Sequence, residues 1–197
     1  HHPSVLFASY SGKIFDSILQ SALGSLLHID TFSDVEAVLL SLQISCGGLG
    51  FPETSSLSKI AFLAACHESG IDALPVPDPP PTDDSIISEY ISSKEWLSSS
   101  HNISFSDITS HHTSRLQHYV SEAINHQTFQ QLELQLSPIL QARLISSTQP
   151  SASAWLLAIP RSPDTTFTND EFITLIHHRL GRPPPGPLLQ SCGNCHH

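Results

Sequence analysis

Apolar residues recur every three or four positions through much of the first 70 residues, which is the spacing of a helix with one apolar face. The pattern predicts a helix over residues 11–28 and a second helix after Ser33, where Glu36 completes an S-x-x-E capping box. A third helix is predicted over residues 54–68, and Gly70 stands where a left-handed helix end is favoured. The apolar face predicted for the first helix contains Ile14, Ile18, Leu19, Ala22, Leu26 and Leu27.

A second group of helices is predicted beyond residue 84. Residues 85–100 fit a short helix. Residues 111–147 fit one or two long helices that are interrupted near Pro138, because proline disrupts a helix from within. The apolar stripe of this long region contains Leu116, Val120, Ile124, Leu132, Leu136, Leu140 and Leu144.

The last apolar segments are shorter. The run "AWLLAIP", residues 154–160, fits either a strand or a buried turn of helix, because so short a run has no diagnostic period. Thr168 and Glu171 form another capping box, which predicts a helix that ends at Gly181. Together these patterns predict a mainly α fold, an irregular helical bundle with proline-rich linkers and at most a minor strand content.

Changes in composition divide the chain into four predicted segments. Residues 71–84 contain five prolines and no apolar period, which indicates a linker. The linker separates a helical segment, residues 1–70, from a helical connector, residues 85–181. Residues 182–197 form a proline-rich tail that ends in a partial cluster of cysteine and histidine.

Three glycines in four residues, Gly47, Gly48 and Gly50, could form a phosphate-binding loop or a tight turn. A Walker loop needs a lysine and a hydroxyl after its last glycine, and a dinucleotide loop needs a preceding strand with G-x-G-x-x-G spacing. Neither is present, since the preceding segment has a helical pattern and Phe51-Pro52 follows. The pattern therefore favours a turn in which glycine permits left-handed backbone and close packing.

The tail "CGNCHH" carries the strongest chemical signal. Cys192 and Cys195 have the spacing of half a zinc site, and His196 or His197 could supply a further ligand. Tetrahedral zinc usually takes a second pair of ligands from elsewhere in the chain. A partial zinc site and a tail that binds nothing are the two interpretations of this segment.

A second candidate metal site lies on the long predicted helix. His118, Glu122 and His126 recur every four residues, so they share one helix face. A solvated polar face opposite the leucine stripe would have the same pattern. No H-E-x-x-H or G-x-S-x-G motif is present, and the paired carboxylates of residues 82–85 follow three prolines. We therefore expect no enzyme active site in this chain. A hydrolase that uses serine and histidine is the weakest alternative.

Composition indicates an acidic chain outside the membrane. The formal net charge is −10, and only eight lysines and arginines are spread over 197 residues, so weak or no binding of nucleic acid is expected. No apolar run is long enough to span a bilayer and no signal-peptide pattern is present, which predicts a soluble, intracellular protein of the nucleus or cytoplasm. Cys46 and Cys66 stand alone in apolar surroundings and are expected in the core. The chain has no methionine, which favours a fragment of a longer reading frame.

The order of the segments resembles the region that follows the reverse-transcriptase palm in non-LTR retroelement polyproteins and their degenerate cellular copies. The matching segments are "FDSILQSALG", "LQISCGGLGF", "SKIAFLAACHES", "SASAWLLAIP", "FTNDEFITLIHHRLGRP" and the terminal C-x-x-C-H. The resemblance spans residues 14–197. The positions that match the family motifs are Gly47, Gly48, Leu49, Gly50, Ala154, Trp155, Leu156, Pro160, Glu171, Phe172, Leu180, Gly181, Cys192 and Cys195.

The resemblance implies that residues 1–70 are thumb-like and that the chain is a non-catalytic connector between a polymerase and a zinc-binding module. The family's catalytic aspartates would lie upstream of this region and its remaining metal ligands downstream. The rest of a larger polyprotein would then be the partner of this chain. The alternative is a free-standing module that binds zinc or another protein through the Cys/His tail.

Overall fold

The computed structural model describes residues 5–71, 86–112, 114–159, 162 and 166–185. These residues form nine α-helices, one 3-10 turn and no strand, so the predicted mainly α fold is confirmed. The elements in chain order are α1 (Val5–Leu27), α2 (Asp34–Ser41), η1 (Ile44–Cys46), α3 (Thr54–Glu68), α4 (Ile86–His101), α5 (Phe105–His111), α6 (Leu116–Gln135), α7 (Pro138–Ser147), α8 (Ala154–Leu157) and α9 (Asn169–Leu180).

Local sequence signals explain most of the helix boundaries. Both predicted capping boxes form, Ser33 with Glu36 at the start of α2 and Thr168 with Glu171 at the start of α9. Pro138 occupies the first turn of α7, where its missing N–H is not needed, so the long apolar region forms two helices. The short run after residue 153 is one turn of helix, α8, and not a strand.

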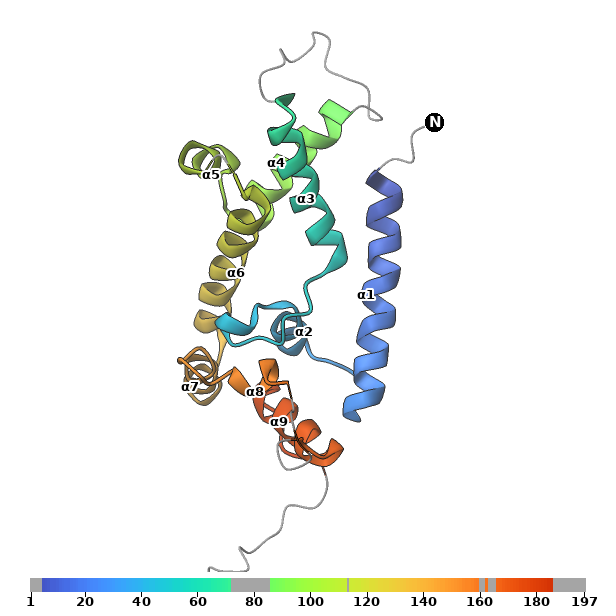
Figure 1. Cartoon of the computed structure of the whole chain (residues 1–197), viewed down its shortest axis with the longest axis vertical. Helices are drawn as coiled ribbons and strands as arrows, with labels where there is room; N and C mark the ends of the chain where they lie inside the picture. Colours follow the sequence, from blue (N-terminus) through green and yellow to red (C-terminus); the bar gives the residue numbers. More distant parts are fainter. Residues whose placement is uncertain (1–4, 72–85, 113, 160–161, 163–165, 186–197) are drawn as a thin grey trace, which may run out of the picture.

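Two apolar clusters lie at opposite ends of an elongated molecule, and α6 runs through both (Figure 1). The first apolar cluster joins the end of α1, α2, the glycine segment, the end of α6, α7 and α9. The second apolar cluster joins α3, α4, α5 and the first half of α6. The buried residues of the first cluster are Leu27, Ile29, Leu39, Leu40, Leu42, Cys46, Leu49, Leu132, Leu144, Ile173, Ile176 and Leu180.

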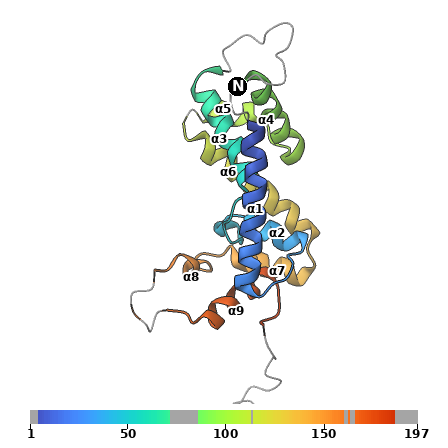
Figure 2. The ribbon, with the colours of Figure 1, turned by 90° about the vertical axis from the view of Figure 1, so that its right-hand side faces the viewer.

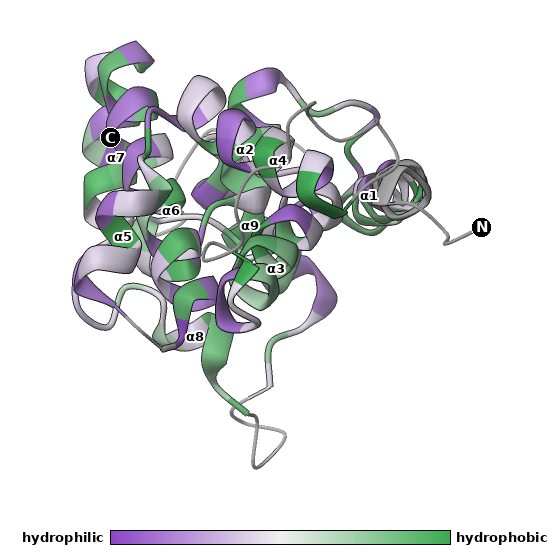
Figure 3. Cartoon of the chain, turned by 90° about the horizontal axis from the view of Figure 1, so that it is seen from above, coloured by the Kyte–Doolittle hydropathy of each residue, from purple (hydrophilic) through white to green (hydrophobic). Residues whose placement is uncertain are grey.

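The long helix α1 extends along one side of the molecule, past both clusters (Figure 2), and lies at the edge when the molecule is seen from above (Figure 3). Its predicted apolar face is only partly correct: Leu27 is buried, but Ile14, Ile18 and Leu26 are 46%, 62% and 57% exposed. The face that packs inward carries Gly12, Asp16, Leu23 and Leu27. A Cβ on Gly12 would lie 3.1 Å from the backbone nitrogen of Ser55, so α1 approaches the start of α3 at backbone contact distance.

A contact of Asp16 helps to set which face of α1 turns inward. Its carboxylate accepts hydrogen bonds from the backbone N–H groups of Thr54 at 2.9 Å and Ser55 at 3.4 Å. These are the first N–H groups of α3, whose own N-cap residue, Glu53, makes no side-chain cap. An aspartate at this position satisfies unpaired donors and complements the positive end of the helix dipole. The capping contact and Gly12 therefore decide which face of α1 meets α3.

The predicted four-segment division stays a prediction. The first apolar cluster combines residues between 27 and 49 with residues between 129 and 180, so its core draws on both predicted helical segments. The predicted linker lies almost entirely outside the described residues, as does most of the tail. None of the helices in the described part of the chain is both long and apolar enough to cross a bilayer.

Candidate functional site

The glycine segment forms a tight turn at the centre of the first apolar cluster. Gly47 ends η1 with a φ of 88°, and Gly50 has a φ of 77°, both in the left-handed region that favours glycine. A Cβ on Gly48 would overlap the carbonyl oxygen of Leu42. The buried side chain of Leu49 points into the core between these glycines. These are the turn and packing conditions that the sequence predicted.

Arg179, on the last turn of α9, reaches into this turn and binds its carbonyl oxygens. Its Nε donates a hydrogen bond to the carbonyl oxygen of Gly48 at 2.9 Å, and its Nη2 donates to the carbonyl oxygen of Ile44 at 2.9 Å. The same Nη2 is 2.9 Å from the hydroxyl of Ser153, just before α8. One side chain therefore joins η1, the glycine segment, the start of α8 and α9.

The environment of Arg179 is unusual for a cation. The residue is 6% exposed, and the acceptors of its hydrogen bonds are neutral oxygens. Burial lowers the pKa of its guanidinium below the usual arginine value. Arginine remains charged even so, because its ordinary pKa lies far above neutral pH. The three short hydrogen bonds are what compensate for the water that the charge has lost.

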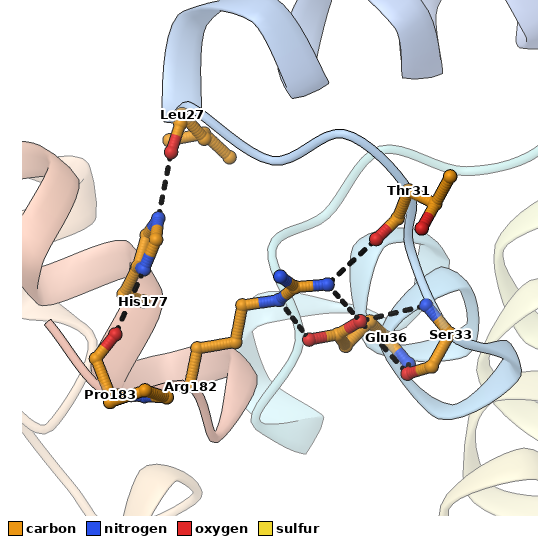
Figure 4. Close-up of polar contacts among 7 residues, drawn as sticks. All are labelled: Leu27, Thr31, Ser33, Glu36, His177, Arg182 and Pro183. Atoms are coloured by element: carbon orange, nitrogen blue, oxygen red, sulfur yellow. Dashed lines mark hydrogen bonds and ion pairs between the residues drawn. The ribbon is translucent and has the colours of Figure 1, made fainter. Parts of the chain in front are cut away.

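Arg182 follows α9 and holds the start of α2 (Figure 4). Its Nε and Nη2 bind the two carboxylate oxygens of Glu36, and Nη2 also donates to the carbonyl oxygen of Thr31 at 2.7 Å. Burial by itself raises the pKa of Glu36, but the hydrogen bonds from Arg182 and Ser33 lower it further than burial raises it. This is a forked pair, a geometry in which arginine binds carboxylate most strongly.

His177 contacts the end of α1 from the same part of α9 (Figure 4). Its ring is 5% exposed, with Nε2 2.7 Å from the carbonyl oxygen of Leu27 and Nδ1 3.1 Å from the carbonyl oxygen of Pro183. Both partners are carbonyl oxygens, and the tautomer of the ring decides which of its two nitrogens donates. His177 thereby fixes the end of α1 against the end of α9.

We name His177, Arg179 and Arg182 the α9 clamp. Within six residues of sequence, these side chains bind the ends of three upstream elements, α1, η1 and α2. The contacts span more than 130 residues of sequence, so they form only when the chain has folded. The arrangement fixes helices relative to one another, and its groups are occupied by structural partners.

Trp155 and Gly181, both singled out by the sequence, lie beside the α9 clamp. Trp155 sits on α8 and packs edge-on against Phe167 and Phe172, with ring centroids 6.2 Å and 6.3 Å apart. Gly181 ends α9 with a φ of 85°. Pro160 lies outside the described residues.

The predicted metal ligands of the tail, Cys192, Cys195, His196 and His197, also lie outside the described residues.

The second candidate metal site is on α6. His118 Nε2 lies 3.7 Å from Glu122 Oε2, and both side chains are about half exposed. In the parts of the chain that the structure describes, no three histidine, cysteine, aspartate or glutamate side chains form a group that could hold a metal ion. The structure therefore pairs His118 with Glu122 and does not bring His126 into a three-ligand cluster with them.

The two other cysteines occupy the core, as predicted. Cys46 and Cys66 are 9% and 5% exposed, in the first and second apolar clusters respectively. Burial raises the pKa of the Cys46 thiol, and the charge of Glu122 adds to this effect. A thiol with a raised pKa is a poor nucleophile, which agrees with a packing role.

The sequence did not identify the α9 clamp. The segment "HHRLGR" has basic residues in the last turn of a helix, a pattern that usually means a favourable interaction with the helix dipole at the surface. The helical spacing of the apolar residues in α9 was the sequence feature that could have indicated the burial of His177 and Arg179. Ile173, Ile176 and Leu180 define the buried face of α9, and His177 and Arg179 lie at positions flanking that stripe.

Comparisons with known proteins add no family to this description. No family model matches the chain, and no curated protein or solved structure matches it significantly.

Proposed function

We propose that this chain is a non-catalytic helical connector from the region that follows the reverse-transcriptase palm of a non-LTR retroelement polyprotein. Its role is to hold the polymerase and a zinc-binding module in a fixed arrangement. Fold alone does not carry this proposal, because helical folds serve many functions. The observation that carries it is the meeting of the three internal motifs at one buried side chain.

Arg179 is the point at which these motifs meet. It belongs to the "EF…HHRLG" motif, and it binds the carbonyl oxygens of Ile44 and Gly48 in the glycine motif. It also binds Ser153, the residue that precedes the "AWL" motif. A chance similarity of short motifs would give no reason for Arg179 to contact a segment 131 residues earlier in the chain. A shared structural role gives that reason.

The positions of the lysine and arginine side chains support weak or no binding of nucleic acid. Of the eight lysines and arginines, Arg179 and Arg182 are used inside the α9 clamp. Lys59 and Lys94 lie over the rings of Trp96 and Tyr90, 4.8 Å and 4.9 Å from the ring centroids. Tight binding of a nucleic-acid backbone needs several free cations on one face. The remaining cations are too few to form such a face.

The transcript that encodes this chain provides the direct test. Amplification of its 5′ and 3′ ends should extend the reading frame in both directions. We expect codons for an aromatic-x-Asp-Asp hairpin upstream and for further cysteine or histidine ligands downstream. A start codon and a stop codon that tightly enclose these residues would refute the connector proposal.

The second test is a titration of the purified chain with single-stranded RNA and with duplex DNA at physiological salt. We expect a Kd weaker than about 10 μM for both, the range of non-specific binding. The chain should be folded by circular dichroism before the titration. An affinity near 1 nM would refute this part of the proposal, because it would require a cationic surface that the described residues do not form.

A further inference from the structure

A pocket of about 370 Å³ lies between α7, α8 and α9, on the outer side of the α9 clamp. The polar and aromatic side chains that line it are Arg143, Ser146, Ser147, Trp155, His178 and Arg179. No aspartate or glutamate is among the described residues that line it. The chain has 18 acidic residues and only eight lysines and arginines. The pocket, with two arginines and no acidic residue, therefore has the opposite charge to the chain as a whole.

Arg143 is half-buried, and one nitrogen of its guanidinium has no partner among the described residues. Its Nη1 is buried and makes no hydrogen bond with any described residue. The side chain comes from the middle of α7 and lies close to the end of α9, where a Cβ on Gly181 would be 3.1 Å from Nη1. Leaving a buried charged donor unpaired costs more than leaving a neutral one unpaired. An anion in the pocket would bind the part of the Arg143 guanidinium that is not buried, since Arg143 lines the pocket.

Arg179 contributes a second positive charge to the same pocket. Its Nε and Nη2 are occupied by oxygens of the glycine turn and Ser153, while Nη1 has no hydrogen bond to a described residue. Because hydrogen bonds at Nε and Nη2 fix the plane of the guanidinium, Nη1 keeps one orientation even when no ligand is bound. The site is therefore pre-organised, which reduces the entropy lost on binding.

Trp155 closes the pocket on the side of α8. Its edge-on contacts with Phe167 and Phe172 hold the indole in place. A half-buried aromatic wall beside two arginines is suited to a ligand that joins an anion to an apolar or aromatic group. Arginine binds phosphate through two parallel hydrogen bonds, a geometry that lysine cannot reproduce.

We propose that this pocket binds a single phosphate group, either inorganic phosphate or the phosphate of a small phosphorylated aromatic compound, through Arg143 and Arg179. His178 and Trp155 form the walls beside the anion. One pocket that takes one phosphate differs from a surface that follows a nucleic-acid backbone. The inference therefore agrees with weak RNA binding and does not depend on the retroelement origin of the chain.

Fluorescence of Trp155 provides the measurement. The chain has two tryptophans, so a Trp96→Phe background leaves Trp155 as the reporter. This protein is titrated with potassium phosphate, with potassium chloride at equal ionic strength, and with adenosine monophosphate. We expect a saturable change for both phosphate compounds, with a Kd of about 1 mM or tighter, and none for chloride. Calorimetry repeats each titration without relying on the fluorophore.

Arg143→Gln is the decisive variant because Arg143 makes no hydrogen bond on which the fold depends. It should weaken binding at least about tenfold, the effect of losing one charge-assisted hydrogen bond. Arg143→Lys keeps the charge but loses the fork and should weaken binding by a smaller factor. The matched control is Arg115→Gln, which removes an exposed charge at the start of α6, outside the pocket, and should leave the Kd unchanged.

Three outcomes would overturn the proposal: no saturation by either phosphate compound, an unchanged Kd in Arg143→Gln, or equal losses in Arg143→Gln and Arg115→Gln. Tighter binding of adenosine monophosphate than of inorganic phosphate would assign the aromatic part of the ligand to Trp155. Equal affinities would assign the site to the free anion. Failure of this titration leaves the reading-frame test of the connector proposal untouched, so the two proposals can fail separately.

Discussion

Replacing Arg179 with methionine tests whether the α9 clamp holds the fold together. The substitution Arg179→Met keeps most of the aliphatic length of the side chain but removes the guanidinium. It therefore deletes the hydrogen bonds to the carbonyl oxygens of Gly48 and Ile44 and to the hydroxyl of Ser153. The carbonyl oxygen of Ile44 keeps other donors, the backbone N–H of Gly47 at 3.1 Å and the Ser153 hydroxyl at 3.2 Å.

The size of the effect follows from these contacts. A hydrogen bond with a charged partner contributes about 1.5–3 kcal/mol, so three give a gross contribution of about 5–9 kcal/mol. Removing a cation that is 6% exposed also removes its desolvation penalty, which is several kcal/mol. The difference between these opposing quantities predicts that Arg179→Met lowers the free energy of unfolding by about 2–4 kcal/mol.

Urea denaturation followed by far-ultraviolet circular dichroism measures this change. At an m-value of about 2 kcal/mol per molar urea, the middle of the usual range, the midpoint should fall by about 1–2 M. Arg143→Met is the matched control, because Arg143 lines the same pocket but makes no hydrogen bond from Nη1. Its midpoint should not fall, because the substitution removes a charged donor that has no partner among the described residues. Equal midpoints for the two variants would refute a structural role for the hydrogen bonds of Arg179.

A double-mutant cycle with Ser153→Ala separates one contact from the others. If the Nη2 contact at 2.9 Å is formed in solution, the coupling energy between Arg179→Met and Ser153→Ala should be about 0.5–3 kcal/mol. Additive effects would mean that α8 is not joined to the glycine turn through Arg179. The contact among the three motifs would then lose its energetic basis.

Two further predictions concern the other parts of the first apolar cluster. Gly48→Ala should lower the free energy of unfolding by at least about 3 kcal/mol in urea denaturation, because its Cβ would overlap the Leu42 carbonyl oxygen. Gly70→Ala has open space around its Cβ but a φ of 80°, so it should lower the free energy of unfolding by only about 1–2 kcal/mol. Equal losses would show that the overlap at Gly48 relaxes until it costs no more than the left-handed backbone at Gly70. The pKa of Glu36 is lower in the folded chain than in the unfolded one. The stability from its pair with Arg182 is therefore fully present above the unfolded pKa of about 4.3, and it is lost as the pH falls through the folded pKa. Glu36→Gln should therefore lower stability near neutral pH and flatten its acid dependence, and an acid limb identical to that of the parent would contradict the assignment.

Sequence patterns predicted the helices well where a local signal decides the structure. The capping residues Ser33 and Thr168 need only their own helix to form their contacts, and both form them. The same holds for Pro138, whose fixed φ and missing N–H separate α6 from α7. In the long region after residue 115, the apolar stripe that begins with Leu116 and Val120 is buried as predicted.

Prediction failed in part on α1, where the pattern of apolar residues did not decide the buried face. Helical spacing places Ile14 and Ile18 on one face, and that face lies in solvent. The inward face is chosen by Gly12, which permits backbone contact with α3, and by Asp16, which caps α3. Both causes involve a residue of another helix, 38 or more positions away, and a single-helix pattern contains no information about it.

The α9 clamp was missed for the same reason: the sequence pattern of one helix contains no information about partners elsewhere in the chain. A sequence of basic residues at a helix end predicts exposed cations, because an isolated charge is costly to bury. Burial of Arg179 becomes favourable only where the glycine turn presents carbonyl oxygens at hydrogen-bond distance, and this turn is formed 131 residues earlier in the chain. The glycines permit the turn, the turn exposes its carbonyl oxygens, and those oxygens allow an arginine in the core. The glycine motif and the last helix therefore depend on each other, and a chain that keeps one for structural reasons must keep the other.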